Sequence, residues 1–242
     1  MFGRGLRTLS IASLVLVMSA FVLVFFYAPN DADQGFVQKI FYLHVPLAIV
    51  ALGGFVTGGV YAVRYLMTGD RAHDLRSYVA IHLSLILAVG ALATGSIWAR
   101  ASWGHWWVWD EPTLVAFLIV FLLYACYQPL RFSIEDRERQ SRYAAVFAVV
   151  AGAFVPINFM AVRFAQTSLT HPRVLDSSDA MPGSMLLTFL VSLLAITVLF
   201  VTLCKYELAS KHASIKLRQL RRRLAGDEEL LTMPRSAAPQ EL

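Results

Sequence analysis

The sequence predicts an all-α integral membrane protein, built as a bundle of six transmembrane helices with both termini in the cytoplasm. Hydrophobic residues make up 57% of the 242 positions and charged residues only 15%, whereas soluble domains are about 45–50% apolar. Six apolar runs are close to or above the roughly 20 residues that a helix needs to cross the hydrocarbon core. Arginine and lysine gather in alternate connecting segments, which is the pattern that orients such a bundle.

The six runs carry little charge and cover residues 8–27, 41–67, 77–98, 113–130, 143–163 and 184–206. The first run follows Arg4 and Arg7, but its apolar core is longer than the 7–15 residues of a signal peptide. We therefore expect an uncleaved first span. In the second run, Gly54 and Gly58 stand four residues apart, a spacing that predicts close approach of a neighbouring helix.

Basic residues predict the orientation. The loops after the second and fourth runs and the tail hold most of them, including Arg71, Arg76, Arg131, Arg137, Arg139, Arg142, Lys205, Lys211, Lys216, Arg218 and Arg221 to Arg223. The opposite loops hold only Lys39, Arg100, Arg163 and Arg173. Since positive loops stay inside, both termini are predicted to face the cytoplasm.

The apolar runs and the basic tail divide the chain into two regions. Residues 1–206 form the predicted membrane domain, with an outward loop at 99–112. Residues 207–242 form a basic cytoplasmic tail, which we expect to be partly disordered, and its basic stretch either lies along the inner leaflet or extends as a solvated helix.

The outward loop contains the stretch WGHWWVWDEPT, residues 103–113. Together with Trp98, it holds all five tryptophans of the chain, at positions 98, 103, 106, 107 and 109. Such a cluster is costly to leave in water, so a membrane or a flat apolar ligand must cover it. The next helix is expected to begin at Pro112, with Glu111 extended. Asp110 then either stabilises the positive end of that helix or contributes to a ligand site.

Three of the six histidines are predicted to lie on the outward side: His44, His105 and His171. Beside the tryptophans they indicate haem, because a porphyrin needs aromatic walls and its iron takes axial imidazoles. His44 and His171 are the best axial candidates, and each is followed closely by a proline, Pro46 or Pro172, which we expect to loosen or stop a helix. Either snorkelling or contact with haem propionates accounts for Arg100, Arg163 and Arg173.

Other chemistry is not indicated. Neither HExxH nor a related zinc spacing occurs, and the two cysteines form neither CxxC nor CxxCH. The chain also lacks a phosphate-cradling glycine loop. We therefore expect neither an enzyme nor a nucleic-acid partner.

The stretch WGHWWVWD resembles the tryptophan-rich WWD signature of the haem-handling proteins of cytochrome c maturation. QKIFYLHVP, residues 38–46, and ATGSIWARASWG, residues 93–104, resemble the segments that accompany that signature. The chain is similar to the cytochrome c maturation protein C family, CcmC, throughout residues 8–206. It departs from the family pattern after Asp110, where Glu111 and Pro112 replace the usual arginine and leucine.

The resemblance implies a protein of the inner membrane that binds b-type haem transiently at the outer, periplasmic face. It implies delivery of that haem to the chaperone CcmE, with the small subunit CcmD and the ABC-type subunits CcmA and CcmB as further partners in the bilayer. By motif position the axial ligands map onto His44 and His171. The platform for the porphyrin and the chaperone maps onto Trp103, Trp106, Trp107, Trp109 and Asp110. Trp98 and Arg100 are further candidates for haem binding.

Three alternatives stay open. A b-type electron-transfer subunit would pair histidines across facing helices at one depth, and His82, near the inner end of the third run, has no partner at its predicted depth. A transporter of haem or another solute would carry ionisable residues in the middle of its spans, where these runs have essentially none. A shorter relative of the cytochrome c synthetases would share the WWD loop.

Overall fold

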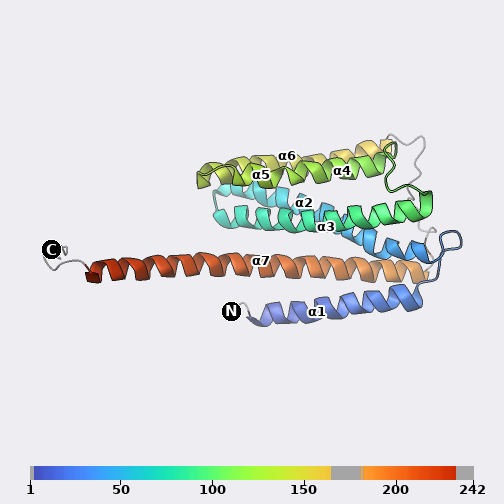
Figure 1. Cartoon of the computed structure of the whole chain (residues 1–242), viewed down its shortest axis with the longest axis horizontal. Coiled ribbons are helices and arrows are strands. Elements are labelled where there is room, and N and C mark those ends of the chain that lie inside the picture. Colours follow the sequence, from blue (N-terminus) through green and yellow to red (C-terminus); the bar gives the residue numbers. More distant parts are fainter. Residues whose placement is uncertain (1–2, 165–180, 182, 233–242) are drawn as a thin grey trace.

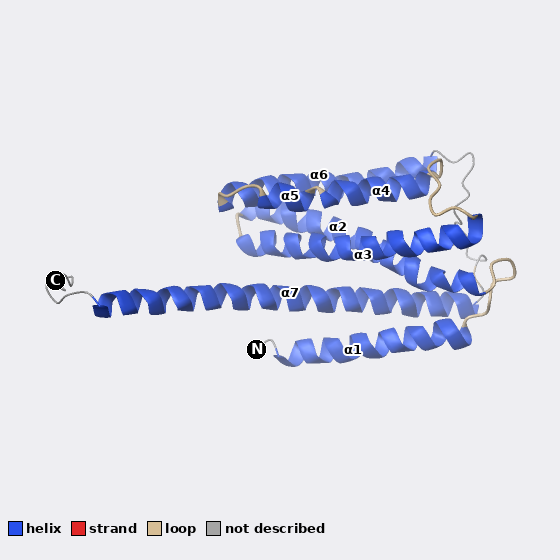
Figure 2. Ribbon diagram, viewed as in Figure 1, coloured by secondary structure: helices blue, strands red, loops and turns tan. Residues whose placement is uncertain are grey.

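The protein is an elongated helical bundle. The computed structural model describes residues 3–164, 181 and 183–232, and the connections between helices are short in the described part (Figures 1 and 2). In chain order the elements are α1 (Gly3–Val22), the π-helix η1 (Leu23–Tyr27), the 3-10 helix η2 (Phe36–Ile40), α2 (Phe41–Thr68), α3 (Arg71–Trp103), α4 (Pro112–Ala125), α5 (Tyr127–Phe132), α6 (Arg137–Phe164) and α7 (Gly183–Thr232).

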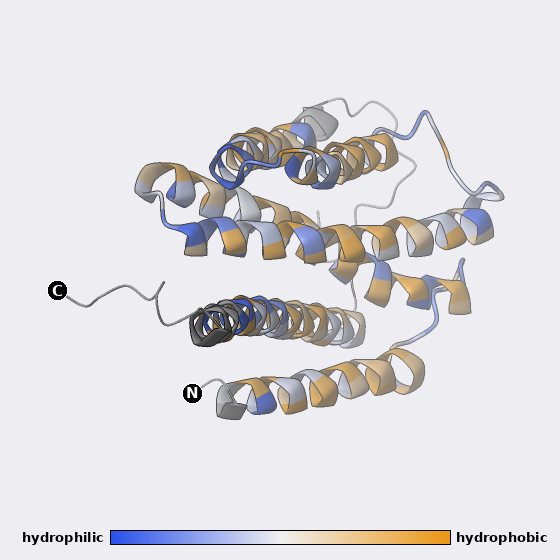
Figure 3. Cartoon of the chain, turned by 60° about the vertical axis from the view of Figure 1, so that its left-hand side comes forward, coloured by the Kyte–Doolittle hydropathy of each residue, from blue (hydrophilic) through white to orange (hydrophobic). Residues whose placement is uncertain are grey.

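Six helices in the described residues are long and apolar enough to cross a membrane, which confirms the six predicted spans. Hydrophobic residues are frequent along the visible faces of the helices, and hydrophilic residues are prominent in the loops and at several helix ends (Figure 3). The fourth span is divided between α4 and α5, which meet at Cys126. Helix α4 begins at Pro112 after an extended Glu111 (φ −88°, ψ 107°), as the sequence predicts.

The helices form a main bundle and a pair beside it (Figure 1). Helices α2 and α3 run antiparallel at the centre of the main bundle, and α6 packs on α2 with α4 and α5 alongside. Helix α1 packs against α7, and α7 in turn contacts α2 and α3. Consequently, α7 joins α1 to the rest of the protein.

Small residues bring α2 and α6 into close contact. A Cβ atom at Gly59 would lie 3.2 Å from the carbonyl oxygen of Ala148 and 3.4 Å from Cα of Gly152, so only glycine allows this approach. One turn earlier, the ring of Phe55 stacks on Tyr124 with centroids 3.9 Å apart. Gly54 and Gly58 meet side chains of neighbouring helices, in agreement with the predicted close packing.

A buried ion pair joins three helices at the opposite end from the tryptophan loop. The guanidinium of Arg131 donates to both carboxylate oxygens of Asp74, each at 2.7 Å, and also to the hydroxyl of Tyr127 at 3.0 Å. Ser141 donates to the same carboxylate at 3.0 Å. Because all four groups are buried and their donors and acceptors are matched, this network holds α3, α5 and α6 in register.

Two segments differ from the expectations. Helix α2 continues through Pro46, so the prediction that this proline loosens or stops the helix is wrong. Proline removes only one backbone bond there, and spanning helices tolerate that loss when neighbours re-satisfy the freed group. Helix α3 continues to Trp103, which leaves 104–111 as the non-helical part of the predicted loop. Pro172 lies outside the described residues.

Helix α7 continues without a break from the sixth span into the predicted tail. Its 50 residues correspond to about 75 Å at 1.5 Å per residue, against a hydrocarbon core of about 30 Å. The helix therefore extends well past the ends of its neighbours (Figure 1). Residues 207–232 extend this helix along its own axis, so they do not fold back beside the spans.

The ion pair generates a stability prediction. Arg131→Leu leaves the Asp74 carboxylate buried without its partner, so we expect the free energy of unfolding to fall by about 3–5 kcal/mol. Replacing both residues by leucine should cost clearly less, because no charge is then left buried. Denaturation of the purified protein in detergent measures the difference, with the exposed Arg139→Leu as control. A double variant as unstable as Arg131→Leu would contradict this account.

Candidate functional site

The candidate site lies where α2 begins and α3 ends. The loop of residues 28–35 precedes this start of α2, and the loop of residues 104–111 follows α3. Both loops lie at the same end of the bundle (Figure 2). The described candidate residues, from His44 to Asp110, therefore lie toward one end of the molecule.

The imidazole of His44 is fixed by α3. Its Nδ1 lies 2.9 Å from the carbonyl oxygen of Ala91 and 3.2 Å from the hydroxyl of Thr94. Because a carbonyl only accepts, this contact assigns the proton to Nδ1 and the lone pair to Nε2. An imidazole held through Nδ1 by a backbone carbonyl is the arrangement found in metal-ligating histidines. His44 is thus chemically suited to ligate a haem iron.

Gly95 makes room for this ring. A Cβ atom at Gly95 would lie only 2.7 Å from Cε1 and 3.2 Å from Nδ1 of His44. Thr94 turns its own hydroxyl back to the carbonyl of Gly90 at 2.8 Å. The small residue and the anchored hydroxyl together form the seat of the imidazole.

Trp98 flanks His44 and is itself held in place. The two rings meet edge to face, with centroids 5.9 Å apart and planes at 79°. The indole Nε1 of Trp98 donates to the side-chain oxygen of Gln34 at 2.7 Å. Gln34 lies in a turn in which the Asp31 carboxylate accepts from two backbone amides, those of Asp33 and Gln34. The loop of residues 28–35 therefore sets the orientation of the tryptophan beside the histidine.

The sequence did not indicate the structural roles of Gln34 and Lys39 next to the candidate site. The stretch NDADQG indicates a turn, since Asp accepts from backbone amides and Gly suits tight turns, but nothing in it shows which side chain Gln34 meets. Lys39 is buried and donates to the carbonyls of Val24 and Ala28 at 2.7 and 3.0 Å. It fastens the end of η1 to η2 next to the site.

Helix α3 ends at Trp103, and the next residue, Gly104, caps the helix in the left-handed conformation (φ 79°). The guanidinium of Arg100 donates to the carbonyl of Gly104. The free carbonyls at a helix C-terminus favour a cation in this position. Arg100 is exposed on the surface. Its remaining donors are thus accessible to an anionic group at the same end.

The tryptophan loop presents aromatic surface to its surroundings. Trp107 and Trp109 meet edge to face, with centroids 6.0 Å apart, and Trp109 and Trp106 are 73% and 61% exposed. Trp107 is half-buried, and its indole Nε1 has no hydrogen-bond partner among the described residues. Large exposed indoles gathered in one loop are typical of a binding surface.

The two acidic residues that follow behave differently. Asp110 is exposed, whereas Glu111 is only 2% exposed and caps the start of α4 without a side-chain cap bond. Burial of Glu111 was not expected, because a carboxylate beside an exposed aspartate looks like another surface charge in the sequence. Glu111 therefore anchors the end of the loop at the start of α4, next to the exposed Asp110.

The predicted second ligand, His171, lies outside the described residues, as does Arg173. The Arg163 side chain belongs to the undescribed part as well. No cluster of three or more histidine, cysteine, aspartate or glutamate residues that could hold a metal ion occurs within the described ranges. The structure therefore brings His44 and Trp98 into contact and places the tryptophan loop at the same end of the bundle, and it leaves the haem site and its second ligand His171 as predictions.

These features define a helical, multi-pass membrane protein with a histidine and an aromatic surface at one end of its bundle. Residues 1–224 match the sequence model of the CcmC family, described as Heme exporter protein C. The chain therefore belongs to that family, as its motifs predicted.

Individual relatives agree with the family assignment. The Heme exporter protein C of Rhodobacter capsulatus is 27% identical over 223 residues, which cover 91% of this chain and 92% of the relative. That of Bradyrhizobium diazoefficiens is 31% identical over 195 residues, or 80% and 73% of the two chains. That of Escherichia coli K12 is 31% identical over 165 residues, or 68% and 67%.

The seat of His44 can be tested by substitution. Gly95→Ala places a methyl group against the imidazole, so we expect the ring to leave the Ala91 carbonyl and to react faster with diethyl pyrocarbonate. Mass spectrometry of the peptide containing His44 measures this rate. Gly53→Ala is the control, because a Cβ atom there meets nothing within 4 Å. Equal His44 modification in the two variants would show that the seat is not as described.

Proposed function

We propose that the chain binds haem at the outer face of the cytoplasmic membrane and delivers it to the haem chaperone CcmE during cytochrome c biogenesis. Its family carries the description Heme exporter protein C, which supports a role in haem handling. The observation that carries the proposal is His44, held through Nδ1 by the Ala91 carbonyl and flanked by Trp98. Haem is the cargo, and its iron accepts the Nε2 lone pair of such an imidazole.

The tryptophans supply the surface for the porphyrin plane and for the chaperone. Trp106 and Trp109 present most of their area to the outside, and a flat apolar ring is the ligand that such indoles cover best. Trp103 and Trp107 are half-buried, and Trp107 contacts Trp109 edge to face. Arg100 is assigned to a propionate, because a guanidinium binds carboxylates through paired hydrogen bonds.

His171 is proposed as the second axial ligand. Two imidazoles would hold a b-type haem without a covalent bond, so the haem stays exchangeable. Delivery then consists of ligand replacement: the iron leaves an imidazole of this chain and takes a ligand of the acceptor. No bond of the porphyrin is made or broken in this exchange, which supports a carrier over an enzyme.

The topology of the proposal places both described ends of the chain in the cytoplasm. The start of α1 and the end of α7 lie at the same end of the bundle (Figure 1), and the basic loops are at that end too. Positive loops are retained inside, so the tryptophan loop would face the periplasm. CcmD and the ABC-type subunits CcmA and CcmB are proposed partners in the inner membrane.

His44→Ala and His171→Ala test the haem site. Because an alanine removes an axial ligand, we expect each variant to lose most of its haem or to change its Soret and α bands, as measured by absorption of the detergent-purified protein. His73→Ala, at the other end of the bundle, should leave the spectrum unchanged. Haem content and spectra that neither axial substitution alters would overturn the proposed site.

The platform generates a separate prediction about transfer. Trp107→Ala or Asp110→Ala should slow haem transfer to purified CcmE by about tenfold or more, the loss expected when one hot-spot side chain is truncated. Membrane insertion and protein level should stay as in the wild type. Phe26→Ala serves as control, since it removes an exposed aromatic ring from η1. Unchanged transfer at equal protein level would remove the loop from the mechanism.

A further inference from the structure

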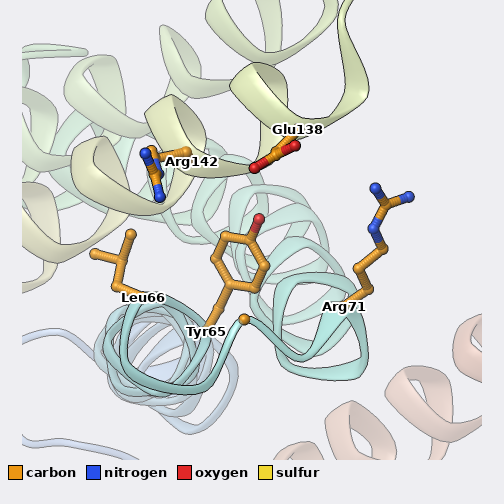
Figure 4. A pocket seen from close by; sticks show the side chains of 6 residues that line it. Tyr65, Leu66, Arg71, Glu138 and Arg142 are labelled. Atoms are coloured by element: carbon orange, nitrogen blue, oxygen red, sulfur yellow. The ribbon is translucent and has the colours of Figure 1, made fainter.

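A polar groove opens at the end of the bundle opposite to the tryptophan loop. It has a volume of about 210 Å³ and lies between the α2–α3 turn and the beginning of α6 (Figure 4). The residues that line it are Tyr65, Leu66, Gly69, Arg71, Glu138 and Arg142. None of them belongs to the candidate haem site.

The groove combines two cations with one anion. Arg71 is the first residue of α3, whereas Glu138 and Arg142 lie one turn apart in α6. In the described part of the chain no ion pair within 4.0 Å joins Glu138 to either arginine. The buried Tyr65 directs its hydroxyl between these side chains (Figure 4). The three charges are therefore available to a ligand that carries both signs.

The depth of the groove corresponds to the headgroup region. Tyr65 and Leu66 belong to the last turn of the span that ends at Thr68, and Arg142 directly precedes the apolar run that begins at Tyr143. Leu66 lines the groove on its apolar side, and Met67 beside it is 79% exposed. A lipid whose headgroup fills the groove would place the start of its acyl chains against this apolar edge.

We propose that the groove binds the phosphoethanolamine headgroup of a membrane phospholipid. The phosphate lies between Arg71 and Arg142, because guanidinium groups bind phosphate oxygens through charge-assisted hydrogen bonds. The ammonium donates to the Glu138 carboxylate, and the Tyr65 hydroxyl donates to a phosphate oxygen. A headgroup with a phosphate and no ammonium would leave the carboxylate facing an anion, and the quaternary ammonium of choline has no N–H to donate. Glu138 therefore selects a headgroup with a primary ammonium.

Native mass spectrometry of the delipidated full-length protein in detergent tests the site. The probes are phosphatidylethanolamine, phosphatidylglycerol and phosphatidylcholine of equal chain length. We expect wild-type protein to prefer phosphatidylethanolamine, and Arg71→Ala with Arg142→Ala to weaken its binding by about tenfold or more, as the loss of charge-assisted hydrogen bonds implies. Glu138→Gln should abolish the preference over phosphatidylglycerol while that lipid still binds.

Arg139→Ala is the matched control, because Arg139 is an exposed arginine of the same helix and does not line the groove. It should bind phosphatidylethanolamine as the wild type does. Binding that the double arginine variant retains, or equal binding of all three lipids by the wild type, would overturn the proposal. Competition by soluble phosphoethanolamine at the concentration of the lipid would also overturn it, since the groove would then hold a soluble phosphate compound.

Discussion

The organisation of this protein depends on one constraint: inside hydrocarbon, every backbone amide and carbonyl must find its partner within the chain. The spans are therefore helical, and the described non-helical segments 28–35 and 104–111 connect helices at their ends. A site that needs varied backbone must then be assembled from helix ends and the loops beside them. His44, in the first turns of α2, and Trp98, in the last turns of α3, meet in this way. Even the Ala91 carbonyl that holds His44 belongs to a helix, and it accepts through a second lone pair.

Two of the main contacts between the helices of the bundle lie away from this site. Gly59 and Gly152 allow α2 and α6 to touch in mid-span, and the pair formed by Asp74 and Arg131 fixes α3 to α5 at the opposite end. At the loop end, Phe41, Tyr42 and Phe189 form a smaller buried cluster against which Trp98 packs. Trp106 does not belong to this cluster and is exposed.

The sequence predicted the spans and the start of α4 because hydrophobic length and proline act locally. It also placed His44 at the correct end of its helix, since depth follows from position within a run. It could not predict that Gln34 holds Trp98 or that Asp74 meets Arg131, because these partners are 64 and 57 positions apart and only tertiary packing joins them. For the same reason Arg131 was assigned to the loop after the fourth run, whereas it is a buried residue of α5. The apolar run was predicted to end at Trp98 because Arg100 lowers the hydropathy there. A charged residue does not interrupt a helix, so α3 continues to Trp103.

A carrier must release its cargo as well as capture it. In the proposed site, capture and release of haem depend on different residues. His44 is held in one tautomer by a backbone carbonyl, so little ordering is needed when it ligates iron, and capture is favoured. Trp106 and Trp109 are largely exposed, so under this proposal an acceptor can contact the same loop that contacts the porphyrin. Affinity differences between related complexes reside mostly in dissociation rates. In the proposed mechanism, an acceptor that contacts the loop raises the rate of release without altering the histidine, and the rigid imidazole and the exposed indoles serve these two separate steps.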